Sequence, residues 1–220
     1  MTINVKFLLK FGSEENIKNL FEKGEIYMNT IQTFKEFDKP GIGDKYEGTV
    51  EILNIKDAKL TFKFPDNPIT VNSPSMQLWK NIGGHVGNIY STYAISNLLL
   101  KRKSVHTVDK RMLQFGTHCI IIKDVEKFIF SILAKLDEKG ITHSHNLVRY
   151  CNYSKNNHEV TLFKKSHLLS YQKEHRIIAY TQNNEPLKFE IGSMHDYAEI
   201  FSANDIINSL KVDYAAQQRS

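Results

Sequence analysis

Apolar and polar residues alternate along the first segment of the chain, residues 4–11. Val5, Phe7, Leu9 and Phe11 fall on one side, and two lysines and a leucine fall between them. A period of two residues is that of a β-strand with one face buried. The pattern therefore predicts a half-buried strand at the start of the chain.

Helical spacing follows this strand at once. Ser13 suits the N-cap position, two glutamates occupy the first turn where the helix dipole favours them, and Gly24 suits the end. The apolar stripe of the helix consists of Ile17, Leu20 and Phe21. A short strand is expected over 25–29, so strand, helix and strand form one compact unit of about 25 residues.

The next segments are shorter and richer in turn residues. Residues 30–37 predict a helical turn with Ile31, Phe34 and Phe37 inward, and 38–48 predict a loop because they hold three glycines and a proline. Segments 49–53 and 59–64 have the pattern of a hairpin, followed by a loose connection to about residue 75. Residues 88–95 predict a strand with hydroxyl groups on both faces.

The second half of the chain is dominated by strands. A β-branched run over 116–122 predicts a central strand, and Asp124 is expected to cap a helix that ends at Gly140. Further strands are expected over 143–153, 159–163, 177–179, 187–191 and 197–201, and a last helix over 205–210. Because the strands are mostly not interleaved with helices, the sequence predicts a single α+β domain over residues 1–220 with largely antiparallel sheets.

Composition narrows the class of protein. Hydrophobic residues make up 41% and charged residues 24% of the 220 positions, values typical of a globular chain. No apolar run reaches the roughly 18 residues that span a membrane, and no signal-peptide pattern is present. Cys119 and Cys151 form no C-x-x-C motif, which favours free thiols in a reducing cytoplasm.

The net charge of +5 favours an anionic partner, of which nucleic acid is the commonest, although a merely basic surface is an equal alternative. Two clusters are candidates for contacts with a phosphate backbone. The first is Lys101, Arg102 and Lys103 with Lys110 and Arg111, and the second is Lys164 and Lys165.

Several common site types lack their motifs. The chain has no P-loop, no G-x-G-x-x-G after a strand and no G-x-S-x-G, so it lacks the signatures of the usual nucleotide-binding and esterase sites. His143 and His145 share a strand face, but no third ligand stands at a diagnostic spacing, and we expect no metal. Cys119 beside His118 has no supporting pattern for a nucleophile and is expected to be buried and inert.

The segment 171–180, with the sequence YQKEHRIIAY, holds the main candidate site. Side chains alternate along a strand, so Gln172 and Glu174, two residues apart, are expected to point to the same side where the strand leaves the core. A carboxylate there can accept a hydrogen bond from a sugar hydroxyl and oppose a developing positive charge. The alternative is an exposed strand end at which Glu174 pairs with Arg176.

Four more residues in other strands are candidates for the same site. They are Lys10, Tyr27, Ser91 and Thr92, and each has a plainer interpretation as a surface lysine, a core tyrosine or a hydroxyl on a solvated face.

The order of short motifs along the chain carries a resemblance. KFG is followed by a helix, by G-x-IY, by F-x-x-x-D with Asp44, Glu47 and Gly48 downstream, by a serine-bearing strand, and by KKSHLLSYQKEHRI. This order resembles a bacterial family of uncharacterised domains that occurs near abortive-infection and phage-defence genes. Members of that family have E-x-E-x-R where this chain has QKEHR.

The same order is similar to that of the ADP-ribosyltransferase superfamily. Members place a basic residue or histidine on the first strand, a Ser/Thr or Tyr on a middle strand, and [Q/E]-x-E on a late strand. Lys10, Ser91–Thr92 or Tyr27, and Gln172 with Glu174 follow this order. The chain departs from the arginine-type pattern in having Lys10 rather than arginine, and STY rather than S-T-S.

The resemblance implies an ADP-ribosyltransferase-like α+β fold of two mostly antiparallel sheets. It also implies a glycosyltransferase that uses NAD as a substrate. Glu174 would hold the ribose 2′-hydroxyl and stabilise the oxocarbenium-like state, and Gln172 would orient an amide or a nucleobase acceptor. Lys10 would contact the pyrophosphate or the adenosine ribose, and Tyr27 or Tyr93 would stack on nicotinamide.

The partners implied are nucleic acid, RNA above all, presented near Lys101–Lys103, and an antitoxin protein. The chain would then be a cytoplasmic toxin or antiviral effector. Two alternatives stay open: a non-catalytic module that binds a nucleotide or a phage product, and a metal-independent ribonuclease that uses His143, His145 or His175 as acid and base.

Overall fold

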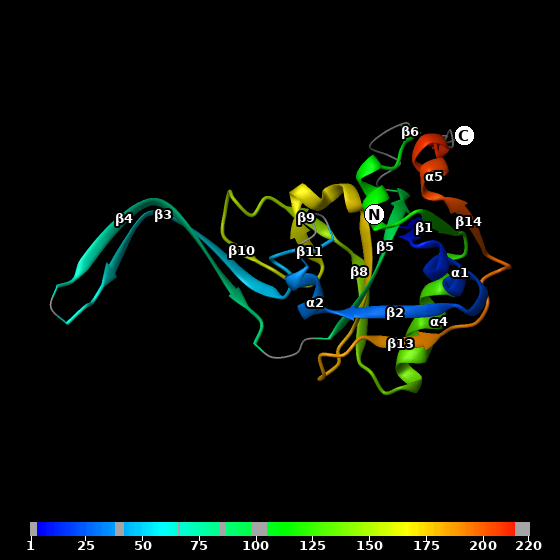
Figure 1. Cartoon of the computed structure of the whole chain (residues 1–220), viewed down its shortest axis with the longest axis horizontal. Coiled ribbons are helices and arrows are strands. Elements are labelled where there is room, and N and C mark those ends of the chain that lie inside the picture. The colour runs from blue at the N-terminus through cyan, green and yellow to red at the C-terminus, as the bar shows by residue number, and fades with distance from the viewer. Residues whose placement is uncertain (1–3, 38–41, 66, 84–86, 98–104, 214–220) are drawn as a thin grey trace, which may run out of the picture.

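The structure is a computed structural model that describes residues 4–37, 42–65, 67–83, 87–97 and 105–213. It is a mixed α+β structure with mostly antiparallel sheets and few helices, as the sequence predicts. The elements gather into one body, and a long two-stranded ribbon projects from it (Figure 1).

The largest sheet in the described residues has eight strands. Its strands are β1 (Val5–Gly12), β2 (Glu25–Thr30), β5 (Asn88–Ser96), β7 (His118–Ile122), β8 (His143–Leu147), β12 (Glu174–Ala179), β13 (Leu187–Glu190) and β14 (Ala198–Ser202). One path runs in the order β13-β2-β5-β1-β7-β14, and β12 and then β8 continue from β5. All described pairings in this sheet are antiparallel. The sheet branches at β5, because β5 pairs with three strands, β1, β2 and β12.

Three smaller sheets and the helices complete the body. A three-stranded sheet contains β3 (Thr49–Phe62), β4 (Ile69–Asn81) and β10 (His158–Glu159), and the two-stranded sheets contain β9 (Arg149–Cys151) with β11 (Lys164–Ser166) and β6 (Val105–His106) with β15 (Val212–Asp213). The helices are α1 (Glu14–Lys23), α2 (Ile31–Glu36), α4 (Val125–Glu138), α5 (Ala203–Ser209) and two 3₁₀ helices, η1 (Lys110–Phe115) and η2 (His167–Gln172).

Capping sets the two main helices where the sequence predicts them. The Ser13 side chain accepts a hydrogen bond from the Asn16 N–H at the start of α1, and Gly24 ends that helix at φ 66°. Asp124 accepts from the Lys127 N–H in the same way at the start of α4. These short-range bonds satisfy N–H groups that have no partner inside the helix, so both helix starts follow from local sequence.

The first strand is buried on both faces, not on one as its alternation predicts. Leu8 packs in the cluster that includes Phe128 of α4, and Leu9 packs in a second cluster that includes Met112 of η1. Both leucines have no exposed surface. Because helices lie on both sides of this sheet, β1 is a central strand, and its polar Lys10 is half-buried among the apolar residues.

Five expectations about the elements are wrong. The stretch up to about residue 75 is not a loose connection, because β4 begins at Ile69. Segments 49–53 and 59–64 do not pair with one another, because 49–62 is one continuous strand whose partner is β4. Asp57 adopts the left-handed conformation (φ 50°) within that strand and does not reverse the chain. Segment 143–153 is divided between β8 and β9, and strand structure near 159–163 is limited to β10. Phe37 is 40% exposed, not inward.

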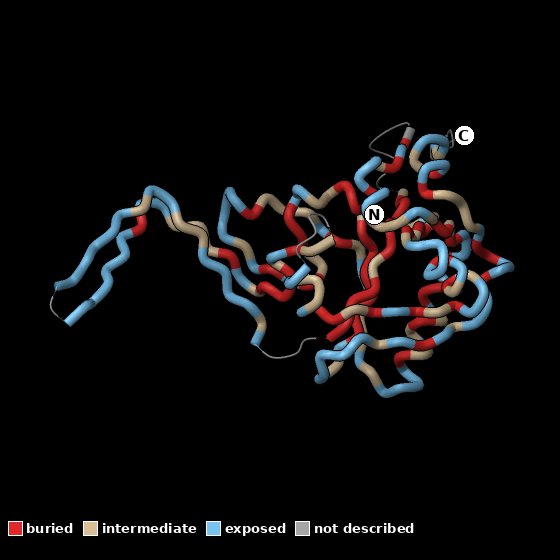
Figure 2. The backbone as a smooth tube through the Cα atoms, in the orientation of Figure 1, coloured by how far each residue is buried: buried red, intermediate tan, exposed pale blue. Residues whose placement is uncertain are grey.

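The β3–β4 ribbon is the part of the structure with the least buried surface. Figure 2 shows it mostly exposed along its length, in contrast to the buried strands at the centre of the body. Within the described residues, no helix is both long and apolar enough to cross a membrane.

Candidate functional site

The large sheet divides at the middle of β5, and the division forms a cavity. Among the described pairings, β2 meets β5 at Ile89 and Asn88, and β1 meets it at Tyr93 to Ser96. The other edge of β5 is occupied by β12, which pairs with Asn88 to Tyr93. Strands β1 and β2 therefore share the remaining edge of β5, and neither of them pairs with β5 over Tyr90 to Thr92 among the described pairings. A cavity of about 580 Å³ lies at this separation.

All six residues predicted for the site line this cavity. They come from five elements, and they are Lys10, Tyr27, Ser91, Thr92, Gln172 and Glu174. The first turn of α1 and the 3₁₀ helix η1 add further walls. The fold therefore brings Lys10 and Glu174, which are 164 residues apart in the sequence, to the wall of the same cavity.

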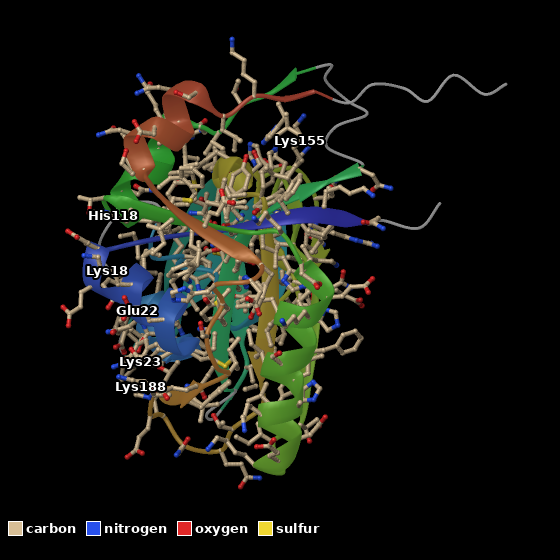
Figure 3. All side chains as sticks on the ribbon, turned by 90° about the vertical axis from the view of Figure 1, so that its right-hand side faces the viewer. Lys18, Glu22, Lys23, His118, Lys155 and Lys188 are labelled. Atoms are coloured by element: carbon tan, nitrogen blue, oxygen red, sulfur yellow. The ribbon has the colours of Figure 1, made fainter. Side chains whose placement is uncertain are left out.

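The inward and outward sides of α1 differ sharply. Ile17 and Leu20 are buried and line the cavity. Lys18, Glu22 and Lys23 project outward from the helix on one side of the molecule (Figure 3), and Lys188 of β13, which lies on the same side, lines the cavity. The helix thus contributes Asn16 and two apolar side chains to the cavity wall and keeps its charged side chains in solvent.

Lys10 occupies the gap between β1 and β2. Its Nζ donates a hydrogen bond of 2.7 Å to the Ser91 carbonyl oxygen, and it lies 4.3 Å from the centre of the Tyr90 ring. Burial lowers the pKa of Lys10 to about 8, against an opposing effect of the Glu174 charge. A cation in this position stabilises a strand carbonyl and offers positive charge to a ligand in the cavity.

Glu174 is the first residue of β12, and only 7% of its surface is exposed. Its Oε1 accepts a hydrogen bond from Lys165 Nζ at 2.7 Å. Its Oε2 accepts from Arg176 Nε at 2.7 Å and from Ser91 Oγ at 3.1 Å. The prediction that Glu174 pairs with Arg176 is correct, but the pair is buried and not at an exposed strand end.

Arg176 is held from behind by a second carboxylate. Its Nη1 and Nη2 donate to the two oxygens of Glu47 at 2.8 Å each, and Nη1 also donates to the Leu162 carbonyl oxygen at 2.6 Å. Arg176 is 2% exposed and Glu47 is 4% exposed. Paired carboxylate and guanidinium groups in this geometry are among the strongest hydrogen-bonded contacts in proteins.

The charges around Glu174 decide its ionisation. Burial alone would raise the pKa of its carboxyl group, but the charges of Arg176 and Lys165 and their hydrogen bonds outweigh burial and hold that pKa well below its usual range. The pKa of Arg176 is raised because Glu174 and Glu47 outweigh the effect of burial. The carboxylate therefore stays ionised over the whole physiological range.

Gln172 reaches Glu174 by a route that the strand pattern did not predict. It ends the 3₁₀ helix η2, and Lys173 after it has a left-handed backbone (φ 44°), so strand alternation does not apply. Lys165 Nζ donates to Gln172 Oε1 at 2.9 Å and to Glu174 Oε1 at 2.7 Å. The amide and the carboxylate are thus side by side because one ammonium group bridges them.

The tyrosines at the cavity differ in their exposure. Tyr27 is 49% exposed at the rim. Tyr93 is buried, and its hydroxyl group lies 2.7 Å from His106 Nε2. Tyr27 is therefore the better placed of the two to stack on a planar ligand.

Other predicted sites lie elsewhere. Lys165 is buried against Glu174 and does not face a phosphate backbone, so that part of the second basic cluster is wrong. Lys101, Arg102 and Lys103 lie outside the described residues, and Arg111 pairs with Asp109 and packs on the Tyr171 ring. Cys119 is buried in the core, and burial raises the pKa of its thiol.

The histidines of the ribonuclease alternative do not line the cavity. His143 Nε2 lies 2.9 Å from Asp137 Oδ1, and His145 Nδ1 lies 3.2 Å from His175 Nε2. Burial, and then the charge of His145, lowers the pKa of His175 to about 4. Across the part of the chain that the structure describes, no three His, Cys, Asp or Glu side chains are grouped so that they would hold a metal ion.

Sequence reasoning missed Lys165 and Glu47 as members of this cluster. Glu47 had one signal, the acidic-glycine segment of the family resemblance, to which no role was assigned. Lys165 had a similar signal, the KKSHLLSYQKEHRI segment of the same resemblance, but it was assigned to a basic surface cluster because a lysine in a KKSH run has the pattern of a solvated residue.

The arrangement suits a ligand that has both a sugar and an anionic group. An ionised carboxylate, a hydroxyl and an amide lie along one wall, a lysine lies between β1 and β2, and a tyrosine stands at the rim. In comparisons with known proteins, no family model matches the chain, and no curated protein or solved structure matches it either.

Proposed function

We propose that this protein is an NAD-dependent mono-ADP-ribosyltransferase that modifies nucleic acid, RNA above all. One observation carries the proposal: six residues chosen by their order in the sequence line one cavity, at the point where β1 and β2 separate along β5. The resemblance of that order to ADP-ribosyltransferases supports the same conclusion, as does the net charge of +5 for an anionic acceptor.

The chemistry assigns distinct roles to the two residues of the Gln172 and Glu174 pair. The bond between C1′ of the ribose and the nicotinamide nitrogen breaks, and nicotinamide leaves as a neutral molecule with the bonding electrons. Glu174 accepts a hydrogen bond from the ribose 2′-hydroxyl and stabilises the cationic sugar. A nucleophilic atom of the acceptor then bonds to C1′ and loses a proton to solvent.

The remaining residues bind and orient the two substrates. Gln172 has no carboxylate and orients a nucleobase by hydrogen bonds, which favours a base over an arginine as the acceptor. Lys10 contacts the pyrophosphate or the adenosine ribose, and Tyr27 stacks on nicotinamide from the rim. As the phage-defence resemblance implies, the protein acts in the cytoplasm as a toxin or antiviral effector, and an antitoxin protein restrains it.

The direct test is transfer of label from NAD. The full chain is incubated with NAD labelled in the adenylate group and, separately, with RNA, DNA and cell protein. We expect label on RNA with the wild type and a loss of at least about 100-fold with Glu174→Gln, since the charge that stabilises the transition state is removed. Glu159→Gln, an exposed glutamate, is the matched control. Equal labelling by the wild type and Glu174→Gln would remove the assigned role.

A second candidate function is a non-catalytic module that binds a nucleotide. It is favoured by the fact that both oxygens of Glu174 already accept hydrogen bonds from Lys165, Arg176 and Ser91. In that case calorimetry shows NAD or another nucleotide binding at the cavity, weakened by Glu174→Gln, while nicotinamide release is absent in the wild type.

A further inference from the structure

Two buried cations touch Glu174 from different elements, and the proposed reaction assigns them no role. Lys165 belongs to β11, and Arg176 lies two residues beyond Glu174 on β12. Neither side chain lines the cavity, whereas Gln172 and Glu174 do. The two cations therefore form a layer behind the residues that would meet a substrate.

Lys165 sets the relation between Gln172 and Glu174. The backbone between these two residues passes through the left-handed Lys173, so it does not place their side chains on one face. The ammonium of Lys165 is 2.9 Å from the amide oxygen and 2.7 Å from the carboxylate. Lys165 is 4% exposed, so water competes little for these bonds.

Arg176 fixes the other carboxylate oxygen and is itself fixed. Its Nε bonds Glu174 Oε2, while its two terminal nitrogens bond both oxygens of Glu47. Glu47 lies 129 residues earlier in the chain, two residues before β3 begins. The guanidinium group thus donates four hydrogen bonds, to two carboxylates and one carbonyl group.

We propose that Lys165 and Arg176 are positioning residues that hold the Glu174 carboxylate in one orientation and in its anionic form, and that Glu47 anchors Arg176 for this purpose. This inference rests on the proposed function in so far as Glu174 serves catalysis. Its electrostatic part concerns the folded protein alone and is measurable without turnover.

The charged and titratable groups near Glu174 come from several elements. Lys165 of β11 and Arg176 of β12 touch the carboxylate, Lys10 of β1 acts on it through its charge, and the Tyr150 hydroxyl of β9 accepts a bond from its backbone N–H. Asp44 and Glu47 lie beyond the two cations. With one cation removed, burial has a greater effect, and protonation of Glu174 moves to higher pH.

The decisive variant is Lys165→Met, with Lys164→Met as its matched control. Lys164 is the neighbouring residue of β11, and its ammonium bonds only an exposed carbonyl group, that of Glu159, among the contacts described for it. We expect Lys165→Met to lower kcat for transfer from NAD by about 100-fold, because misplacement of a reacting group by about 1 Å has this effect. We expect KM for NAD to change by less than about threefold, and Lys164→Met to stay within about twofold of the wild type.

The pH profile separates positioning from simple loss of folding. In the wild type we expect no acid limb from Glu174 above pH 4, whereas in Lys165→Met the activity falls as pH decreases towards the raised pKa of the carboxyl group. Lys165→Arg keeps the cation and is expected to restore the wild-type acid limb. A fall in kcat with an unchanged acid limb in Lys165→Met would overturn the proposal.

A carboxyl titration followed by carbon NMR makes the test independent of activity. Protein labelled with ¹³C at glutamate side chains is titrated as wild type, Lys165→Met and Lys164→Met, with Glu174→Gln to assign the signal. We expect the Glu174 signal to titrate at higher pH in Lys165→Met than in the other two forms. An identical titration in all forms contradicts the inference, whereas absence of NAD turnover in the wild type contradicts only the proposed function.

Discussion

The strand β12 and the β3–β4 ribbon depart from the usual distribution of polar and apolar residues in opposite directions. Every residue of β12 is buried, including Glu174, His175 and Arg176. On the ribbon, apolar residues are exposed: Leu60 by 36%, Phe62 by 50%, Ile69 by 53% and Val71 by 46%. One region encloses charge, and the other presents hydrocarbon to solvent.

The difference lies in what surrounds each region. The cations and carboxylates behind β12 pair with one another from β11, β12 and the segment before β3. Lys165, Arg176, Glu174 and Glu47 thus each have an opposite charge within 3 Å. The ribbon pairs Phe62 with Ile69 and Leu60 with Val71, so its apolar side chains share one face that no described element covers. Removing one of the enclosed charges would therefore leave its partner buried and uncompensated, whereas removing an exposed side chain of the ribbon would change little that is buried.

The largest expected effect comes from removing a charge from the enclosed cluster. Arg176→Met leaves Glu47 and Glu174 buried with one cation fewer, and we expect it to lower the free energy of unfolding by about 3–5 kcal/mol. The measurement is urea unfolding at pH 7, with the exposed Arg149→Met as control. A loss below about 1 kcal/mol would show that the cluster is not what stabilises this region.

Next in size is a pH effect from His175, which is 4% exposed and faces His145. Burial, and then the charge of His145, lowers its pKa from 6.5 to about 4 in the folded protein. Between these pH values the unfolded chain binds a proton that the folded chain does not, so stability decreases as pH falls from 6.5 to about 4. We expect a decrease of about 2–3 kcal/mol, measured by unfolding across this range.

The control for this effect uses two histidine variants. His175→Gln is expected to remove this part of the pH dependence, and His167→Gln, at an exposed position of η2, is expected to keep it. The same slope in both variants would assign the effect to other groups.

The elements that sequence predicted well are those fixed by a few neighbouring residues. Ser13 and Asp124 cap helices through bonds to N–H groups three residues later, so the start of each helix is visible locally. The mispredicted hairpin shows the limit. Lys56 and Asp57 have the composition of a turn, yet Asp57 takes a left-handed conformation while the strand continues, and the chain reverses only near Pro65.

The candidate site was predictable in its cavity-lining residues and not in the layer behind them. Lys10, Ser91 and Glu174 follow an order along the chain that a family resemblance makes visible. The contact between Glu47 and Arg176 spans 129 residues, and nothing near either residue indicates the other. Lysine in a charged run is usually solvated, so the burial of Lys165 depends on packing that no local pattern contains.

A smaller effect is expected from Lys10, the half-buried lysine of β1. Burial lowers its pKa to about 8 from 10.5, so from pH 8 to 10.5 the unfolded chain holds a proton that the folded chain has lost. The stability that this group contributes therefore rises with pH in that range. Because Lys10 is half-buried and not fully buried, we expect a rise of only on the order of 2 kcal/mol. We expect Lys10→Met to remove this rise and Lys6→Met, exposed on the same strand, to retain it.

The smallest effect is expected on the β3–β4 ribbon, and it tests whether the exposed apolar side chains there contribute to stability. Phe62 is half exposed, and its nearest aromatic partner is Phe64, with ring centres 6.4 Å apart. Because Phe62→Ser removes hydrocarbon that is already largely in water, we expect the free energy of unfolding to change by less than about 0.5 kcal/mol. Ile52→Ala, in the buried base of the same strand, is expected to lower it by about 2–5 kcal/mol. If urea unfolding gave Phe62→Ser a loss comparable to that of Ile52→Ala, the apolar face of the ribbon would have to be covered in solution, and the two regions would obey the same rule.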